Sequence, residues 1–280
     1  MPVGGLRDRI ERGDCLLWID YVDYASRLLE PGGVPWTDTA GTVAWYRRAQ
    51  GLLGSDVVPI PLWPIATRVV TAVPGVLEQM RAKTRVTHAL RALLSSDDLR
   101  TASGELARAL RVMFPQALLA LSLPTPRNAI ALAHGAATNG AAERPAIGED
   151  EVDAAGPYLA DFLRGFGDAG LDLLLLESSR IVDSDELQSC RPMLNTARHY
   201  GWEVGLAAPE SGLAPLPDGF EFFVGQSAQP VAAELMPRSV RVAGVGEGAE
   251  AAFFFAQVPR EATPERVLTA LARARSGAGH

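Results

Sequence analysis

The chain has 280 residues, 48% of them hydrophobic, so it can bury a large core and is near the size of one α/β barrel. Its net charge of -7 argues against nucleic acid as a partner, because phosphate binding needs concentrated positive charge. It contains neither a basic, apolar leader nor an apolar run of about 20 residues, so we expect a soluble, cytoplasmic protein without membrane contact. The two cysteines, Cys15 and Cys190, are far apart and are expected to be free thiols.

Short apolar runs alternate with amphipathic segments, which is typical of βα units around a parallel sheet. There are eight candidate strands, the number that closes a barrel: Cys15–Asp20, Val57–Trp63, Gln116–Leu123, Leu171–Glu177, Trp202–Ala208, Phe220–Gly225, Val240–Gly244 and Ala252–Gln257. A further run, Arg68–Val73, is assigned to an extra hairpin after the second strand. We therefore predict a single TIM-type (β/α)8 barrel over residues 1–280, with an N-terminal extension at 1–14 and a frayed tail at 276–280.

Helices are indicated by apolar residues at helical spacing and by start and stop signals. The expected helices are Thr42–Leu53, Leu106–Phe114, Tyr158–Ala169, Ser184–Tyr200 and one that starts at Thr263-Pro264-Glu265. The small, polar stretch Ala136–Gly148 is expected to be a mobile loop on the face where the strands end.

The fourth strand carries the strongest functional signal. Leu173–Leu176 are four consecutive leucines, as expected of a strand buried on both faces, and Glu177 follows them directly. Chemistry in parallel barrels is located at the carboxyl ends of the strands. A partly desolvated carboxylate has a raised pKa, so Glu177 is our first candidate for a general acid or base. A salt bridge from Glu177 to Arg180 is the structural alternative.

Four segments carry a family resemblance: Gly165–Ser178, Thr263–Val267 with Arg273–Arg275, Arg68–Val76 and Ala117–Pro126. They resemble the uroporphyrinogen decarboxylase and cobalamin-independent methionine synthase superfamily of barrels. In that order they correspond to its "AGAD" turn and acidic fourth strand, its last helix ("PPENV"), its hairpin after the second strand and its third strand ("PLIG…GP"). The resemblance spans roughly residues 15–275 and implies a barrel with its site at the strand ends.

The catalytic motifs of both branches of this superfamily are absent. The thiol-alkylating members hold zinc with a His-x-Cys pair after the fifth strand, where this chain reads Gly205–Glu210. The porphyrin decarboxylases have an Arg-Gln-Ala-Gly-Arg loop after the first strand and an Asp after the second, where this chain reads Asp20–Tyr24 and Leu62–Pro64. We therefore expect no bound transition metal and no cofactor, and the porphyrin substrate is not carried over.

Two further clusters follow the predicted strands. Asp20 and Asp23 are three residues apart, so they face one side of a helical turn and can serve as an acid and a base of different pKa. Helix capping by Asp20, a solvated Asp23 and an ion pair from Asp23 to Arg27 remain alternatives. Tyr21 and Tyr24 lie beside them as candidate binding residues.

Arg127 follows the third strand and is a candidate carboxylate clamp, or else a surface arginine at a helix start. His134 is seven residues later on the same helical face, and Trp63 would form an apolar wall. The remaining candidate binding residues are Arg180, Glu210 and Gln226.

The sequence supports three functional hypotheses. The first is a metal-independent, decarboxylase-like lyase that acts on a small carboxylate-bearing molecule by general acid–base catalysis. The second is a one-carbon or alkyl transferase of the methionine synthase type without zinc, and the third is a non-catalytic ligand-binding barrel. For the first, Glu177, Arg127 and one of Asp20 or Asp23 are expected to share a pocket. A homodimer is compatible with the sequence.

Overall fold

The computed structural model describes residues 5–138, 140, 146–209, 216–226, 235–243 and 253–277. The strands are β1 (Leu16–Asp20), β2 (Val57–Pro61), β3 (Leu118–Pro124), β4 (Leu173–Glu177), β5 (Glu203–Pro209), β6 (Phe222–Gln226), β7 (Met236–Arg238), β8 (Val240–Val242) and β9 (Phe253–Gln257). The helices are α1 (Leu6–Glu11), α2 (Val22–Leu29), α3 (Thr39–Leu53), α4 (Leu62–Ala72), α5 (Pro74–Arg81), α6 (Val86–Leu94), α7 (Asp97–Met113), α8 (Pro126–Thr138), α9 (Glu149–Arg164), α10 (Ser184–Ser189), α11 (Arg191–Tyr200) and α12 (Pro264–Gly277). None of the helices described is long and apolar enough to span a membrane.

The strands form two ladders, ordered β2-β3-β4-β5-β6-β8 and β1-β9-β7. The neighbours from β2 to β6, and the pair β1 and β9, are parallel. The segment from β7 to β8 runs antiparallel to both β6 and β9 and lies between them. At the other junction, the Asp56 N–H donates to the Leu17 carbonyl and the Asp56 carboxylate accepts from the Leu17 N–H, each at 2.8 Å. The sheet is therefore mostly parallel and curves around an inner core.

Side chains from both ladders fill this inner core. The Trp18 ring on β1 packs against Phe222 on β6 and Phe255 on β9, with ring centroids 6.1 and 5.1 Å apart. Leu6 and Ile10 of α1 join the same cluster near the amino ends of the strands. Alternate strand residues such as Leu174 and Leu176 instead face the helices, in agreement with the twofold side-chain period of a strand.

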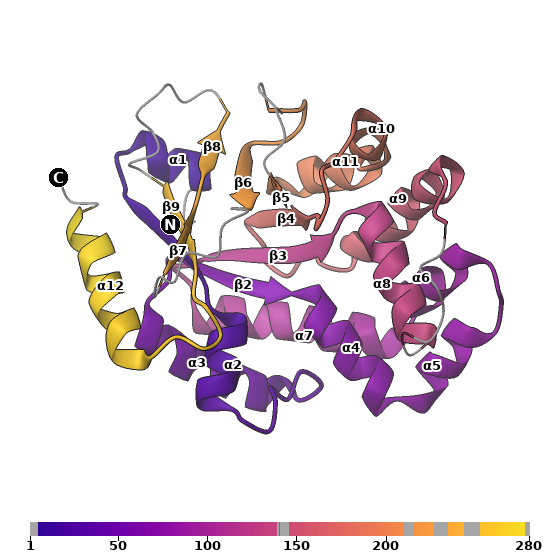
Figure 1. The fold of residues 1–280 in the computed structure, drawn as a ribbon, viewed down its shortest axis with the longest axis horizontal. Helices are drawn as coiled ribbons and strands as arrows, with labels where there is room; N and C mark the ends of the chain where they lie inside the picture. Colours follow the sequence, from indigo (N-terminus) through magenta and orange to yellow (C-terminus); the bar gives the residue numbers. More distant parts are fainter. Residues whose placement is uncertain are drawn as a thin grey trace.

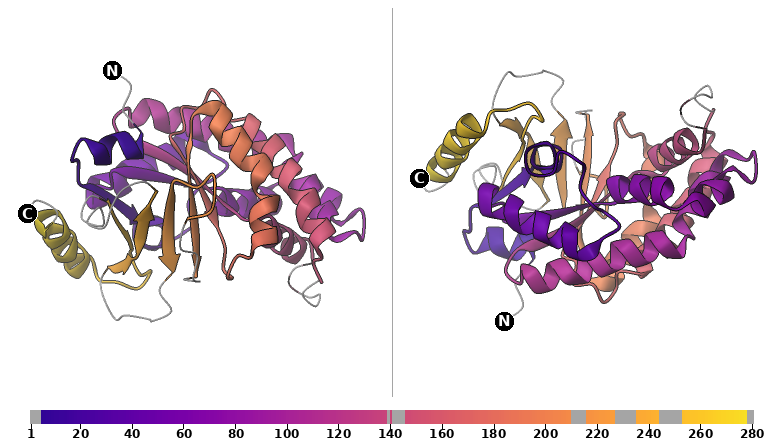
Figure 2. Two further views of the ribbon diagram at one scale, coloured as in Figure 1. Left: turned by 90° about the horizontal axis from the view of Figure 1, so that it is seen from above. Right: turned by 90° about the horizontal axis from the view of Figure 1, so that it is seen from below.

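The helices cover the outside of the sheet (Figure 1). α2, α3 and α7 lie on one flank of the strands, and α9, α10 and α11 lie on another (Figures 1 and 2). The arrowheads of β2 and β3 point toward α4 and α8, beyond which α5 and α6 pack (Figure 1). α3 ends at Gly54 and α11 ends at Gly201, both in the left-handed conformation that glycine adopts at helix ends.

The expected α/β class with a mostly parallel sheet is confirmed, but a closed ring of eight parallel strands is not present in the described residues. The run expected as the seventh parallel strand is the antiparallel β8, and no ladder joins β1 to β2. The extra hairpin predicted at Arg68–Val73 is wrong, because this run forms the end of α4. Its apolar residues pack at helical spacing, with Ile65, Val69 and Val70 buried. The loop expected at Ala136–Gly148 begins later, since α8 continues to Thr138.

Candidate active site at the strand ends

Four polar side chains continue the inward-facing rows of the inner core. Glu177 follows Leu173 and Leu175 at every second position of β4. Asp20 continues the row of Leu16 and Trp18 on β1. Because successive strand residues alternate between faces, Asp20 and Glu177 lie on the inner face at the carboxyl ends of their strands.

Gln257 and Arg238 are inner-face residues for the same reason. Gln257 follows Phe253 and Phe255 on β9 and lies level with Asp20. Arg238 is two positions before the inner-core residue Val240. An Arg238 Nη2–H donates to the side-chain oxygen of Gln257. Neither residue was singled out in the sequence, although the alternation Phe253, Phe255, Gln257 was a usable signal.

These side chains line a cleft of about 1090 Å³. Its apolar floor is the top layer of the inner core, formed by Leu175, Ala207, Val224 and Phe255. Its polar and charged lining is Asp20, Arg127, Asn128, His134, Thr138, Glu177, Ser178, Ser179, Arg180, Arg238 and Gln257. An apolar floor with a few convergent polar groups is the usual composition of a ligand site.

The two carboxyl groups of the cleft are shifted toward their neutral forms. Desolvation by the surrounding protein atoms raises the pKa of Glu177 to about 7, and the negative charges of Asp20 and Asp23 add to this rise. Desolvation raises the pKa of Asp20 to about 6, with a further rise from Asp23, while Arg238 and the Val22 N–H oppose it. Glu177 is nonetheless open to water inside the cleft, which moderates the shift. Between about pH 6 and about pH 7, Asp20 is therefore the more ionised and Glu177 the more protonated carboxyl group of the pair.

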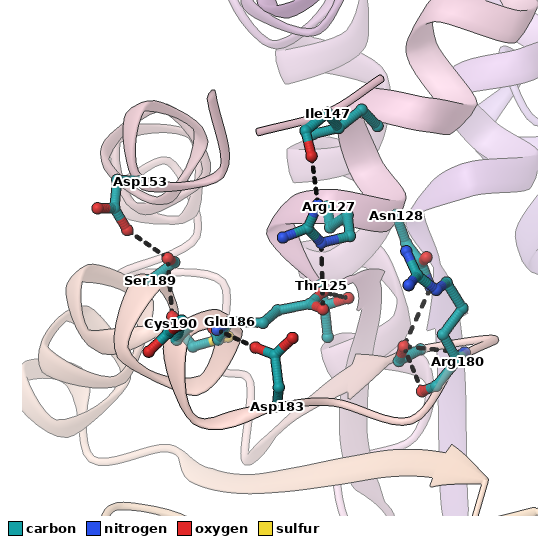
Figure 3. Close-up of polar contacts among 12 residues, drawn as sticks. Thr125, Arg127, Asn128, Ile147, Asp153, Arg180, Asp183, Glu186, Ser189 and Cys190 are labelled. Atoms are coloured by element: carbon teal, nitrogen blue, oxygen red, sulfur yellow. Dashed lines mark hydrogen bonds and ion pairs between the residues drawn. The ribbon is translucent and has the colours of Figure 1, made fainter. Parts of the chain in front are cut away.

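Arg127 lines the cleft, but its guanidinium is held by protein groups (Figure 3). Its Nη1 donates to the carbonyl of Ile147, and its Nε lies 3.7 Å from Oε2 of Glu186. Glu186 is buried and accepts a 2.7 Å hydrogen bond from the Thr125 hydroxyl. Arg127 therefore joins the start of α8 to α10 and to the segment before α9, so the carboxylate-clamp role is better suited to Arg238.

A smaller network orders the loop after β4 (Figure 3). The Ser178 hydroxyl donates to the Arg180 carbonyl at 2.8 Å and accepts from the Arg180 N–H at 3.1 Å. Asn128 donates to the same hydroxyl at 3.4 Å. The alternative of a salt bridge between Glu177 and Arg180 is not seen in the residues described. Arg180 is exposed and lines the cleft.

Of the expected site residues, Glu177, Asp20, Arg127, Trp63, His134 and Arg180 line this cleft. Tyr21 and Tyr24 do not: both are buried outside the inner core, and Tyr21 packs against Trp45. Their positions follow from the strand period, because Tyr21 continues the outward-facing row of Leu17 and Ile19.

Asp23 is exposed and acts on the cleft only through its charge. The alternative of an ion pair from Asp23 to Arg27 is not seen among the described residues, where Arg27 pairs with Glu261 at 3.0 Å. Glu210 and the side chain of Gln226 lie outside the described residues.

A second hollow of about 880 Å³ lies between α3 and α7. It is lined by small and apolar residues with Arg47 and Arg48, and no carboxylate or histidine contributes to its described lining. It lies on the helix face of the molecule rather than at the strand ends. The cleft that contains Glu177 is therefore the candidate functional site.

Within the part of the chain that the structure describes, no three His, Cys, Asp or Glu side chains converge as metal ligands. Cys15 is exposed at the start of β1, and Cys190 is buried between α10 and α11. Comparison with known proteins finds no matching family model, no matching curated protein and no matching solved structure.

Proposed function

We propose that the cleft is the active site of a metal-independent lyase that decarboxylates a carboxylate-bearing molecule by general acid–base catalysis. One observation carries the proposal: Glu177 and Asp20 lie at one cleft with pKa values raised to about 7 and about 6. A general acid is most effective when its pKa lies near the working pH.

Glu177 is the proton donor in this proposal. The bond between the carboxylate carbon and its neighbour breaks, CO2 leaves, and the electron pair stays on the neighbouring carbon. That carbon takes the proton of neutral Glu177, which water then reprotonates. Asp20, ionised above about pH 6, keeps the proton on Glu177 through its negative charge.

Arg238 is the proposed anchor for a carboxylate of the substrate. It is an inner-face residue oriented by Gln257, and guanidinium groups bind carboxylates through two parallel hydrogen bonds. Arg180, at the mouth of the cleft, adds a second positive charge. Arg127 supports the wall instead, because Glu186 and the Ile147 carbonyl occupy its guanidinium.

We further propose that the fold is a modified (β/α)8 barrel related to the uroporphyrinogen decarboxylase and methionine synthase superfamily. In it the segment from β7 to β8 replaces the seventh parallel strand. The site at the strand ends and the inner core enclosed by both ladders support this relation. The cytoplasmic location and a homodimer remain expectations.

The test is CO2 release from a panel of 3-oxo acids and substituted malonates. Wild-type protein is expected to release CO2 from at least one member, and Glu177→Gln to lower that rate by about 10²–10⁴. Glu78→Gln, an exposed glutamate on α5 outside the cleft lining, is the matched control and should keep the wild-type rate.

If Glu177→Gln retains the wild-type rate, the proposed role of Glu177 is wrong. If no acid of the panel is turned over but several bind in the cleft, the ligand-binding hypothesis replaces the lyase. Methyl transfer from a pterin donor without CO2 release would instead favour the transferase.

A further inference from the structure

The cleft extends along one face of α8, away from the catalytic carboxylates. Asn128, Ala131, Leu132, Gly135 and Thr138 all line it. Their spacing of three, four, seven and ten residues from Asn128 places them on a single helical stripe. The cleft therefore extends from the strand ends along α8, where His134 is a further ionisable group of the lining.

The part along α8 combines the apolar residues Ala131, Leu132 and Gly135 with polar side chains. Ala131 is exposed, and the Leu132 side chain is 40% exposed, although both lie in an ordered helix. Trp63 from α4 and Ile147 complete the lining on other sides. We call these residues, with Gly135, the apolar arm. An apolar surface of this kind, continuous with a polar site, marks a place for an apolar part of a ligand.

Gly135 keeps the arm open. A Cβ added at Gly135 would meet no atom of the described residues within 4 Å, and its backbone is not in the left-handed region. The absence of a side chain therefore serves neither close packing nor an unusual conformation. In a helix this absence lowers stability, since glycine is less favourable than alanine inside a helix.

The Arg127–Glu186 pair holds the far wall of the arm in place. Arg127 donates to the carbonyl of Ile147, so it fixes this residue opposite α8 (Figure 3). Glu186, which is buried, fixes the guanidinium in turn. A wall built on a buried ion pair indicates that the arm is preformed.

The size of the cleft agrees with a two-part ligand. A drug-sized molecule occupies a pocket of about 300–1,000 Å³, and this cleft measures about 1090 Å³. A small acid bound by Arg238 would leave the arm filled with water against exposed Leu132.

We propose that the substrate is an amphiphilic carboxylate, with its carboxylate at Arg238 and Arg180 and an apolar body in the arm. The carboxylate end of this inference rests on the proposed function, whereas the arm stands on its own lining. The charges at the strand ends disfavour a purely apolar ligand, because it would displace water from the half-buried Arg238 and Asp20 without offering them a hydrogen bond.

Calorimetric titration with butanoate and octanoate tests the proposal without any turnover. A fully buried methylene contributes about fourfold in affinity, so four half-buried methylenes give octanoate an advantage of roughly tenfold or more. Gly135→Trp fills the arm and should make the two acids bind with similar affinity while leaving butanoate unaffected. Gly51→Trp on α3 is the matched control, because its added Cβ also meets no atom within 4 Å and it lies outside the cleft lining.

Ala131→Trp, at an exposed position of the arm, serves the same purpose if Gly135→Trp does not fold. Equal affinities of butanoate and octanoate for the wild-type protein would refute the proposal that the arm binds an apolar body. The same proposal would be refuted if octanoate still bound more tightly than butanoate in both Gly135→Trp and Ala131→Trp. If octanol binds as tightly as octanoate, the apolar role of the arm stands, but carboxylate binding at Arg238 and Arg180 is refuted, and the proposed function with it. Failure of both acids to bind would overturn both proposals.

Discussion

The Nε of Arg127 lies 3.7 Å from Oε2 of Glu186, a carboxylate that is almost fully buried. The pair connects the start of α8, the turn of α10 and the carbonyl of Ile147 (Figure 3). An arginine that follows a strand of the sheet, and that resembles a substrate clamp in sequence, is thus part of the support of the cleft. Its loss is expected to affect stability and the shape of the cleft more than charge recognition.

Arg127→Ala is expected to lower the free energy of unfolding by about 3 kcal/mol, because Glu186 would keep a buried charge without its partner. Urea denaturation followed by circular dichroism measures this change. Arg180→Ala removes an exposed arginine of the same cleft and should change stability by less than about 0.5 kcal/mol. Equal losses in the two variants would contradict the supporting role of the pair.

Glu177→Gln is expected to stabilise the fold at pH 8 and to have no effect at pH 4. The pKa of this carboxyl group rises on folding, here from 4.5 to about 7. Its contribution to the free energy of unfolding is therefore complete only below the unfolded pKa and is lost as the pH rises through about 7. Because water reaches Glu177 in the cleft, the gain should be about 1 kcal/mol, less than the full shift implies. Melting temperatures across this range measure it.

The catalytic pH profile follows from the same groups. The proposed reaction needs Asp20 ionised and Glu177 protonated, so the rate should rise through about pH 6 and fall through about pH 7. Asp20→Asn should remove the lower limb of the profile. A rate that still rises above pH 8 would show that neutral Glu177 is not the proton donor.

Glu203→Ala is expected to loosen α1 from the base of the inner core. The Glu203 carboxylate accepts hydrogen bonds from the Arg7 N–H at 3.1 and 3.3 Å, so it acts as a distant cap of this short helix. Losing a cap costs about 1 kcal/mol, and trypsin should then cleave faster at Arg7 and Arg9. Glu11→Ala, on the exposed side of α1, is the control, and equal cleavage rates would refute the capping role.

Thiol titration separates the two cysteines. Cys15 is exposed, whereas Cys190 is buried and its pKa is raised by burial and by the charge of Glu186. The native protein should react with one equivalent of a thiol reagent, and Cys15→Ser should abolish this reaction. Fast reaction of both thiols would show that the packing between α10 and α11 opens readily.

The alternation of apolar runs and amphipathic segments was sufficient to predict the α/β class and the order of most strands. Glu177 was predictable because four buried leucines fix the strand and the twofold side-chain period fixes the face of the next residue. The same reasoning applied to Phe253 and Phe255 would have identified Gln257. It would also have excluded Tyr21 from the site, because this residue directly follows β1 and continues the outward-facing row of Leu17 and Ile19.

Only the tertiary structure decided which charged groups remain for a ligand. The apolar pattern of Val240–Val242 fits a parallel or an antiparallel strand equally. Pairing of β8 with β6 and of β7 with β9 selects the antiparallel direction that carries Arg238 to the cleft. Arg127 and Glu186 are 59 positions apart, so no local pattern reports their contact. The raised pKa of Glu177 depends on burial and on Asp20 and Asp23 from a distant part of the chain, and that of Asp20 depends chiefly on burial, because desolvation and charge act through space.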